Sequence, residues 1–252
     1  MNYLIDCNSY KSTTYDKRVR FLILHYTAEN FASSIESLTN KLSAHYLIPD
    51  PTDPTYKHNQ LNIFNLVPEH ERAWHAGVSA WEDRTNLNDS SIGIEIVNMA
   101  PGDQSTNLDF PDYNEQQIQA TIELCNNIIT RHPEITPTRI IGHCDIAPGR
   151  KNDPGPKFPW HKLYKHGIGA WYDVKTKEKY LAKYSKNLPK ISQIQSQLKN
   201  YGYAINITDN YDKQTKDCIR AFQIHFRPEK YDGIIDIETI AILSALIEKY
   251  KK

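Results

Sequence analysis

Residues 142–160, GHCDIAPGRKNDPGPKFPW, form the segment that most restricts how this chain can fold. A short apolar run, residues 139–141, precedes the segment and predicts a buried strand. The segment itself is so rich in Pro and Gly that it predicts a long, stiffened loop instead of a helix or a strand. Three of its side chains, His143, Lys151 and Asp153, can face a single point. The loop is therefore either a Pro-rich surface connection or the support of a functional site.

Two other apolar runs predict strands that carry polar residues. Residues 19–24, VRFLIL, predict a buried strand with His25 at its end, and residues 91–97, SIGIEIV, predict a strand with Glu95 in its middle. In α/β domains, catalytic and ligand-binding residues commonly lie at the ends of strands. The plain alternatives are a structural His25 and a Glu95 on the polar face of an edge strand, because burying an unpaired charge is costly.

The rest of the N-terminal part alternates between helical and extended patterns. A capping box that starts at Ser33 predicts a helix over residues 33–42. Further strands are predicted over residues 43–48 and 62–67, and the second is expected to pair with the first. The clearest helical pattern spans residues 114–132, where a capping Asn precedes it and a Pro follows it.

The C-terminal part has a different pattern. Residues 175–190 are Lys-rich and weakly patterned, which predicts a linker. Three helical patterns follow, and an Asp-x-x-Thr sequence at Asp212 and at Asp236 supplies an N-cap for the second and the third. We therefore expect a domain over residues 1–174 that holds all the candidate chemistry and a small three-helix domain over residues 191–252.

Charge and hydropathy exclude two classes of partner. The 252 residues contain 30 Lys and Arg against 30 Asp and Glu, so the basic excess of a nucleic-acid-binding protein is missing. The longest apolar run near the start, residues 21–24, is far below the ~20 residues of a membrane span. The first residues lack the pattern of a signal peptide, which fits a cytoplasmic protein or a sequence that starts after a removed signal.

The four cysteines are scattered and form no C-x-x-C pair, so they predict neither a zinc knuckle nor a disulfide framework. Cys144 stands beside His143, but adjacent residues of a strand point to opposite faces. We therefore expect Cys144 to be a small core residue and not a metal ligand.

His25, His143 and Asp153 together have the chemistry of a catalytic zinc site. Two imidazoles and a carboxylate leave one coordination position open, and zinc held in this way lowers the pKa of bound water to about 7. Glu95 would then accept the proton of the water, and Lys151 would meet the developing oxyanion. H-E-x-x-H and G-x-S-x-G are both absent from the sequence, so the zincin and serine-hydrolase routes lack their signatures.

With these residues in place, the chain resembles the zinc-dependent N-acetylmuramoyl-L-alanine amidases. The resemblance covers nearly all of residues 19–172. It runs through ILHYTA (23–28), SAHYLI (43–48), LVPEHERAWHAG (66–77), NDSSIGIEI (88–96) and the segment GHCDIAPGRKNDPGPKFPW. It implies an α/β fold with a central mixed β-sheet flanked by helices, like that of the peptidoglycan recognition proteins. It also implies the site roles, which are zinc ligands at His25, His143 and Asp153, the catalytic base at Glu95 and the transition-state stabiliser at Lys151.

The shared motifs contain further candidates for substrate binding, namely Tyr26, His45, Trp74 and His75. The segment around Trp74 is as compatible with an aromatic plug as with the lining of a cleft. Distant relatives of the same fold place a Tyr directly before the His of the SAHYLI motif. Ala44 occupies that position here, which fits a branch that relies on the glutamate base.

The tail, with AFQIHFRP (221–228) and DGIIDIETIAIL (232–243), resembles a three-helix peptidoglycan-binding domain. The two-domain order is similar to that of periplasmic, often lipoprotein, amidases of Gram-negative bacteria. Shorter cytoplasmic relatives that recycle anhydro-muropeptides lack the tail. The resemblance thus favours the cell envelope or periplasm, with any membrane attachment supplied by a segment outside this sequence, and leaves the cytoplasm as the alternative.

The resemblance implies an enzyme with one zinc ion per chain. Its substrate would be peptidoglycan or muropeptides, cut between the lactyl group of N-acetylmuramic or anhydro-muramic acid and L-alanine. The competing functions are a non-catalytic peptidoglycan recognition module and a zinc peptidase that cuts within the stem peptide. Because the tail carries none of the candidate chemistry, a protein that ends near Tyr172 is expected to keep zinc and to cleave soluble muropeptides.

Overall fold

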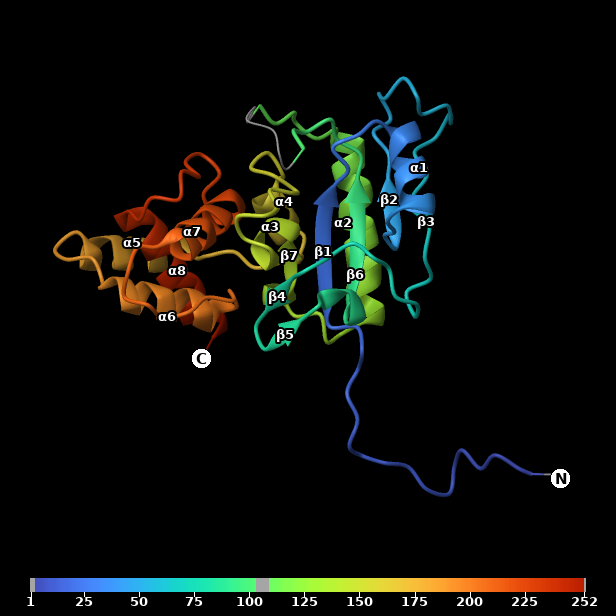
Figure 1. Ribbon diagram of the computed structural model, residues 1–252, viewed down its shortest axis with the longest axis horizontal. Coiled ribbons are helices and arrows are strands. Elements are labelled where there is room, and N and C mark those ends of the chain that lie inside the picture. The colour runs from blue at the N-terminus through green and yellow to red at the C-terminus, as the bar shows by residue number, and fades with distance from the viewer. Residues whose placement is uncertain (1–2, 103–108, 252) are drawn as a thin grey trace.

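A five-stranded sheet forms the centre of the N-terminal domain in the computed structural model, which describes residues 3–102 and 109–251 (Figure 1). In spatial order its strands are β3 (Phe64–Asn65), β2 (Tyr46–Ile48), β6 (Ser91–Ile96), β1 (Phe21–Tyr26) and β7 (Ile140–Gly142). Strands β2, β6, β1 and β7 run parallel, and β3 is antiparallel to β2. The expected mixed sheet is confirmed. A separate ribbon pairs β4 (Ala80–Trp81) with β5 (Arg84–Thr85).

Helices cover the sheet and build the C-terminal domain. Those of the N-terminal domain are α1 (Phe31–Asn40), α2 (Glu115–Arg131), α3 (His143–Ile146) and α4 (Trp160–Lys165), with 3-10 turns at Leu87–Asp89 and Pro137–Arg139. Those that follow are α5 (Val174–Tyr184), α6 (Ile191–Tyr201), α7 (Lys213–Phe226) and α8 (Ile237–Tyr250). The N-cap side chains of Asp212 and Asp236 accept hydrogen bonds from the backbone of Thr215 and Thr239, as predicted. No helix in the described ranges is long and apolar enough to cross a membrane.

The alternation of side chains along β1 divides the core into two layers. Leu22 and Leu24 point to one face and share a hydrophobic cluster with α2. Phe21 and Ile23 point to the other face and share a second cluster with the C-terminal helices. His25 follows the same alternation as Phe21 and Ile23, so it lies on the face opposite α2, toward the C-terminal domain.

Two local predictions are corrected by the caps that the structure shows. Helix α1 begins at Phe31 because the side chain of Asn30, and not that of Ser33, is the N-cap and accepts from the backbone N–H of Ser33. The predicted loop after β7 opens with the helical turn α3, because the Asp145 carboxylate accepts the N–H of Gly142 at 2.9 Å and closes that turn. The Pro-rich remainder of the segment is a loop until α4 begins at Trp160.

Residues 175–190, predicted to be a linker, contain most of α5. The aromatic side chains of this helix recur at i and i+4, which gives it a face that packs against α8. Tyr180 donates to the carboxylate of Glu248 at 2.8 Å, and the hydroxyl of buried Tyr184 lies 2.9 Å from that of Ser244. The Lys-rich composition obscures this face in the sequence pattern, and within residues 175–190 only 185–190 lie outside the helix.

Candidate active site

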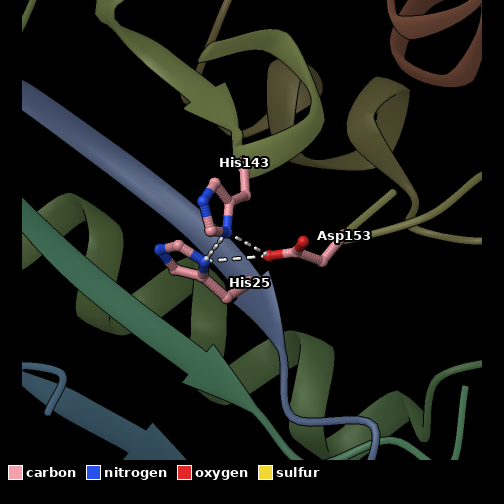
Figure 2. Close-up of side chains that lie close together, drawn as sticks. All are labelled: His25, His143 and Asp153. Atoms are coloured by element: carbon pink, nitrogen blue, oxygen red, sulfur yellow. Dashed lines mark hydrogen bonds and ion pairs between the residues drawn. The ribbon is translucent and has the colours of Figure 1, made fainter. Parts of the chain in front are cut away.

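Three side chains, one from β1 and two from the segment after β7, meet at one point above the sheet (Figure 2). His25 comes from the end of β1, His143 from the first residue of α3, and Asp153 from the loop that follows. The Nδ1 atoms of the two histidines lie 3.0 Å apart, and Oδ2 of Asp153 lies 2.9 Å from the first and 3.0 Å from the second. All three residues are buried. The structure therefore brings together the three residues predicted as metal ligands.

The donor set fits a zinc ion. Ligand atoms about 2.0–2.2 Å from a tetrahedral zinc are separated from each other by about 3.3 Å. The measured separations of 2.9–3.0 Å are close to this value, and all three atoms carry lone pairs that face the same point. Two imidazoles and one carboxylate are ligand types that zinc prefers, and a zinc ion held by them would have a further position for water.

The tautomer of His143 is set by its outer nitrogen. Nε2 lies 3.1 Å from the backbone carbonyl of Ala76, to which it donates its proton, so that Nδ1 keeps its lone pair for a metal. The guanidinium of Arg150 donates to the same carbonyl at 3.1 Å and to that of Val78 at 2.7 Å. Arg150 thus fixes the carbonyl that orients His143.

A chain of hydrogen bonds sets the tautomer of His25 in the same way. Its Nε2 lies 3.0 Å from Nδ1 of His75, and Nε2 of His75 lies 3.2 Å from the hydroxyl of Ser91. That hydroxyl donates to the carbonyl of Leu87 at 2.6 Å. Because the last donor is fixed, each nitrogen along the chain has a single consistent role, and Nδ1 of His25 again keeps its lone pair. The ring of His75 rests on Gly93, where an added Cβ would lie only 2.5 Å from the ring.

The environment of the site lowers the pKa values of both Asp153 and His25. Burial alone would raise the pKa of Asp153, but the adjacent rings of His143 and His25 hold the pKa of that carboxyl far below its usual range. Burial lowers the pKa of His25 to about 4, although the hydrogen bond to Asp153 acts in the opposite direction and raises it. Both effects keep Asp153 ionised and His25 neutral, which are the forms that bind a metal.

Glu95 stands next to this cluster on the neighbouring strand. Its Oε1 lies 4.0 Å from Nδ1 of His25, and Oε2 is buried without a hydrogen-bond partner among the described residues. Burial, with the charge of Asp153 added, raises the pKa of Glu95 well above its usual value. Strand β6 lies between β2 and β1, so the alternative of a solvated carboxylate on an edge strand is wrong.

A pocket of about 380 Å³ opens over the cluster and is lined by Lys151 as well as by Glu95. Tyr26 and Trp74 also line it, as does one side of His75. The Tyr26 hydroxyl donates to the carbonyl of Pro101 at 3.0 Å, and Trp74 is 56% exposed. Tyr26 and Trp74 therefore lie at the pocket, and their substrate-binding roles stay predictions. His75 has both ring nitrogens engaged behind His25, in a position that orients the His25 ring, and its substrate-binding role stays a prediction.

His45 does not reach the pocket, and its predicted role in substrate binding is corrected. The side chain is fully buried, its Nδ1 accepts the backbone N–H of Gly93 at 3.0 Å, and its Nε2 faces the carbonyl of Glu71 at 3.3 Å. Both ring nitrogens therefore join backbone segments. Cys144, in contrast, is buried in the hydrophobic cluster behind α3, as predicted, although it lies on a helical turn and not on a strand.

The sequence patterns did not identify several residues that build the site. Arg150 is one, and its only signal is its place between two motif residues. Asn88 is another, since its side-chain oxygen accepts from the backbone of His75 at 3.0 Å and of Ala76 at 2.7 Å. These two bonds hold in place the segment that carries the outer hydrogen-bond partners of His25 and His143.

Comparison with protein families gives two matches along the chain. The family model described as N-acetylmuramoyl-L-alanine amidase matches residues 15–156, and the one described as putative peptidoglycan binding domain matches residues 187–243. Among characterised proteins, the N-acetylmuramoyl-L-alanine amidase AmiD of Escherichia coli K12 is 43% identical over 250 residues, which are 98% of this chain and 89% of AmiD.

Solved structures show the same similarity in three dimensions. The crystal structure of AmpDh3 from Pseudomonas aeruginosa superposes with a TM-score of 0.95 at 52% identity, over 100% of both chains. The crystal structure of AmpDh3 in complex with anhydromuramic pentapeptide superposes with a TM-score of 0.94 at 53% identity, over 99% of both chains. AmiD from E. coli, in complex with the substrate anhydro-N-acetylmuramic acid-L-Ala-D-γ-Glu-L-Lys, superposes with a TM-score of 0.85 at 42% identity, over 99% of this chain and 96% of that one.

Proposed function

The chain belongs to the N-acetylmuramoyl-L-alanine amidase family, and from this we propose that it is a zinc enzyme whose metal is held by His25, His143 and Asp153. As in its relatives, the bond that it hydrolyses is the amide between muramic acid and L-alanine. The observation that carries the proposal is the meeting of three donor atoms within 2.9–3.0 Å of one another. Beside them lies a carboxylate whose buried oxygen has no hydrogen-bond partner in the part of the chain that the structure describes.

Zinc bound to this donor set would supply an activated water and would polarise the carbonyl of the scissile amide. Glu95 is the proton acceptor in this scheme. Burial raises its pKa above that of an ordinary carboxylate, which makes it a stronger base, and its second oxygen, which has no hydrogen-bond partner among the described residues, can take the proton of the attacking water. The same group can then deliver that proton to the leaving amine of L-alanine.

Lys151 lines the pocket that contains Glu95 and Asp153. We assign its ammonium group to the negative charge that develops on the carbonyl oxygen during attack, because such a donor acts mainly in the transition state. Tyr26 and Trp74 offer aromatic surfaces at the pocket wall for the sugar and the peptide. Together these residues account for the binding and hydrolysis of a muropeptide.

We propose that residues 1–174 form the catalytic domain and that residues 191–252 form a peptidoglycan-binding domain. The match of residues 187–243 to that domain family supports the second assignment. A domain that binds polymeric peptidoglycan would raise the local concentration of substrate at the active site. The same match favours an enzyme that works on the cell wall in the envelope or periplasm.

Product analysis tests the function directly. A purified anhydro-muropeptide is incubated with the protein, with and without a chelator, and the products are identified by mass spectrometry. The amidase releases the intact stem peptide and a free lactyl carboxylate, and the chelator stops the reaction. A shortened peptide still attached to the sugar would instead identify a peptidase. Binding without any product, from protein that carries zinc, would identify a recognition module.

A further inference from the structure

Helix α7 of the C-terminal domain lies against the loop that carries three of the proposed active-site residues. This loop, residues 143–153, contains the ligands His143 and Asp153 together with Lys151. Figure 1 shows α7 beside α3, and the two helices are in direct contact. The loop therefore has the sheet on one side and the C-terminal domain on the other.

The first contact is made at Asp145, two residues after the ligand His143. Its carboxylate is buried and accepts three hydrogen bonds, from the backbone of Gly142 at 2.9 Å, from the hydroxyl of Tyr203 at 2.5 Å and from Nδ1 of His225 at 2.7 Å. Two of these three donors belong to the C-terminal domain. Without them the turn that presents His143 would rest on a buried carboxylate with most of its hydrogen bonds missing, which is costly.

The second contact is made at the other end of the loop. The guanidinium of Arg220, on α7, donates to the side-chain oxygen of Asn152 at 2.6 Å, one residue before the ligand Asp153. Between the two ends, Gly149 approaches α7 so closely that a Cβ there would lie 2.2 Å from the carboxylate of Asp217. The loop is thus in contact with the C-terminal domain near its beginning, middle and end.

We propose that the C-terminal domain is a scaffold of the metal site as well as a wall-binding module, and that Tyr203, His225 and Arg220 are positioning residues for the zinc-binding loop. The proposal rests on the proposed function, because it concerns the same ligands. Tyr203 and His225 act through Asp145 on the turn that presents His143. Arg220 acts through Asn152 on the segment that presents Asp153. None of the three touches the donor atoms.

Two conservative substitutions in the full-length protein test the proposal. Tyr203→Phe removes one hydroxyl and keeps the buried ring, and Arg220→Met removes the donor and keeps the apolar stem. Their matched controls are Tyr211→Phe, which removes a hydroxyl bonded to Gly233 within the C-terminal domain, and Lys216→Met, which changes an exposed residue one turn earlier on α7.

Three quantities are measured for each protein. They are the zinc affinity by competition with a chromophoric chelator, kcat and KM on a soluble anhydro-muropeptide, and the hydrogen exchange of the amides in residues 143–153. We expect the two test variants to lose about tenfold in zinc affinity, the lower end of the effect of outer-sphere partners. We also expect a lower kcat at little-changed KM and faster exchange in the loop. The controls should behave as wild type.

Zinc affinity, kcat and loop exchange that all stay at the wild-type level in both test variants would overturn the proposal. So would equal losses in the test variants and their controls, because these would show general destabilisation. If the wild-type protein itself binds no zinc or cleaves no muropeptide, the proposed function fails. The exchange of residues 143–153 then still decides whether the C-terminal domain holds the loop.

Discussion

His25 and Glu95 are register partners across the parallel β1–β6 pair, and Nδ1 of the first lies 4.0 Å from Oε1 of the second. Paired residues of neighbouring parallel strands present their side chains on the same face. A proposed metal ligand and the proposed base are therefore both placed by the buried centre of the sheet. Their separation depends on strand register and not on the conformation of a loop.

Glu95→Gln tests the role of the base, because it keeps the size of the side chain and removes its ability to accept a proton as a carboxylate. We expect kcat on a soluble muropeptide to fall by about 10²–10⁴, the range for general acid–base catalysis. Zinc content, measured by elemental analysis, should stay at one ion per chain. A variant with near-normal turnover would show that another group takes the proton.

Lys151→Met tests the stabilisation of the transition state. The loss of one donor to an oxyanion lowers kcat by about 10²–10³, while KM changes little because the interaction is weak in the ground state. The matched control is Lys157→Met, which removes an exposed lysine further along the same Pro-rich segment, where it pairs with Asp112 at 3.0 Å. A rise in KM at unchanged kcat would make Lys151 a residue for docking the substrate.

Gly93→Ala tests the hydrogen-bond chain behind His25. The new Cβ would lie 2.5 Å from the ring of His75, which must move and release Nε2 of His25. Loss of such an outer partner costs about 10–100-fold in metal affinity. Ser91→Ala is the comparison, since it leaves His75 in place and removes only its outer acceptor, so it should cost less. Chelator competition measures both, and equal affinity in Gly93→Ala and wild type would contradict the assigned role of His75.

Much of the site could be predicted because its residues stand in or beside short, β-branched apolar runs, which favour buried strands. His25 and Glu95 were found from the runs FLIL and IGIEI, and Asp212 and Asp236 from their capping pattern. The α1 start was missed because Asn30 competes with Ser33 for the cap. Both can cap a helix, and local sequence does not rank them.

The packing of the C-terminal domain against the N-terminal domain could not be predicted. Trp81 pairs by a backbone bridge with Tyr203, more than a hundred residues away, and its ring packs against Tyr201 and Tyr203. No periodicity links residues at such separations. His45 was misassigned for a related reason, because a histidine in a motif looks the same whether its nitrogens face a pocket or, as here, the backbone of Gly93.

A partly buried ionic network at the end of α2 predicts how stability depends on pH. The carboxylate of Glu69 accepts from Tyr46 at 2.7 Å, lies 2.8 Å from Nε2 of His132 and pairs with Arg131. Although burial opposes it, the hydrogen bonds from Arg131, His132 and Tyr46 lower the pKa of Glu69 from 4.5 to about 2. A depressed folded-state pKa stabilises the protein above the unfolded value, and this contribution is lost as the pH falls from 4.5 toward 2.

Glu69→Gln should therefore reduce the free energy of unfolding by about 1–3 kcal/mol at pH 7, and the difference from wild type should shrink below pH 4.5. Urea unfolding at several pH values measures this. Glu71→Gln, at an exposed neighbouring position, is the control and should change little. A difference between wild type and Glu69→Gln that is independent of pH would show that the charge of Glu69 does not contribute.

Removal of the C-terminal domain is the change for which sequence and structure predict opposite results. A protein that ends at Tyr172 would lose Tyr201, Tyr203 and the whole of α7, and would expose Trp81, which is now fully buried. Exposure of one tryptophan costs on the order of 4–6 kcal/mol, comparable with the ~5–15 kcal/mol that stabilises a whole domain. We therefore expect this protein to be insoluble or to lack a cooperative unfolding transition, and to hold zinc poorly.

Deletion of residues 1–14 is the matched truncation, because the described residues among them are exposed, and it should leave the unfolding transition in place. Circular dichroism and chelator competition on both proteins measure the two outcomes. A soluble, cooperatively folded protein ending at Tyr172 with wild-type zinc affinity would show that the shared core is dispensable. The C-terminal domain would then act only outside the active site, as the sequence alone predicts.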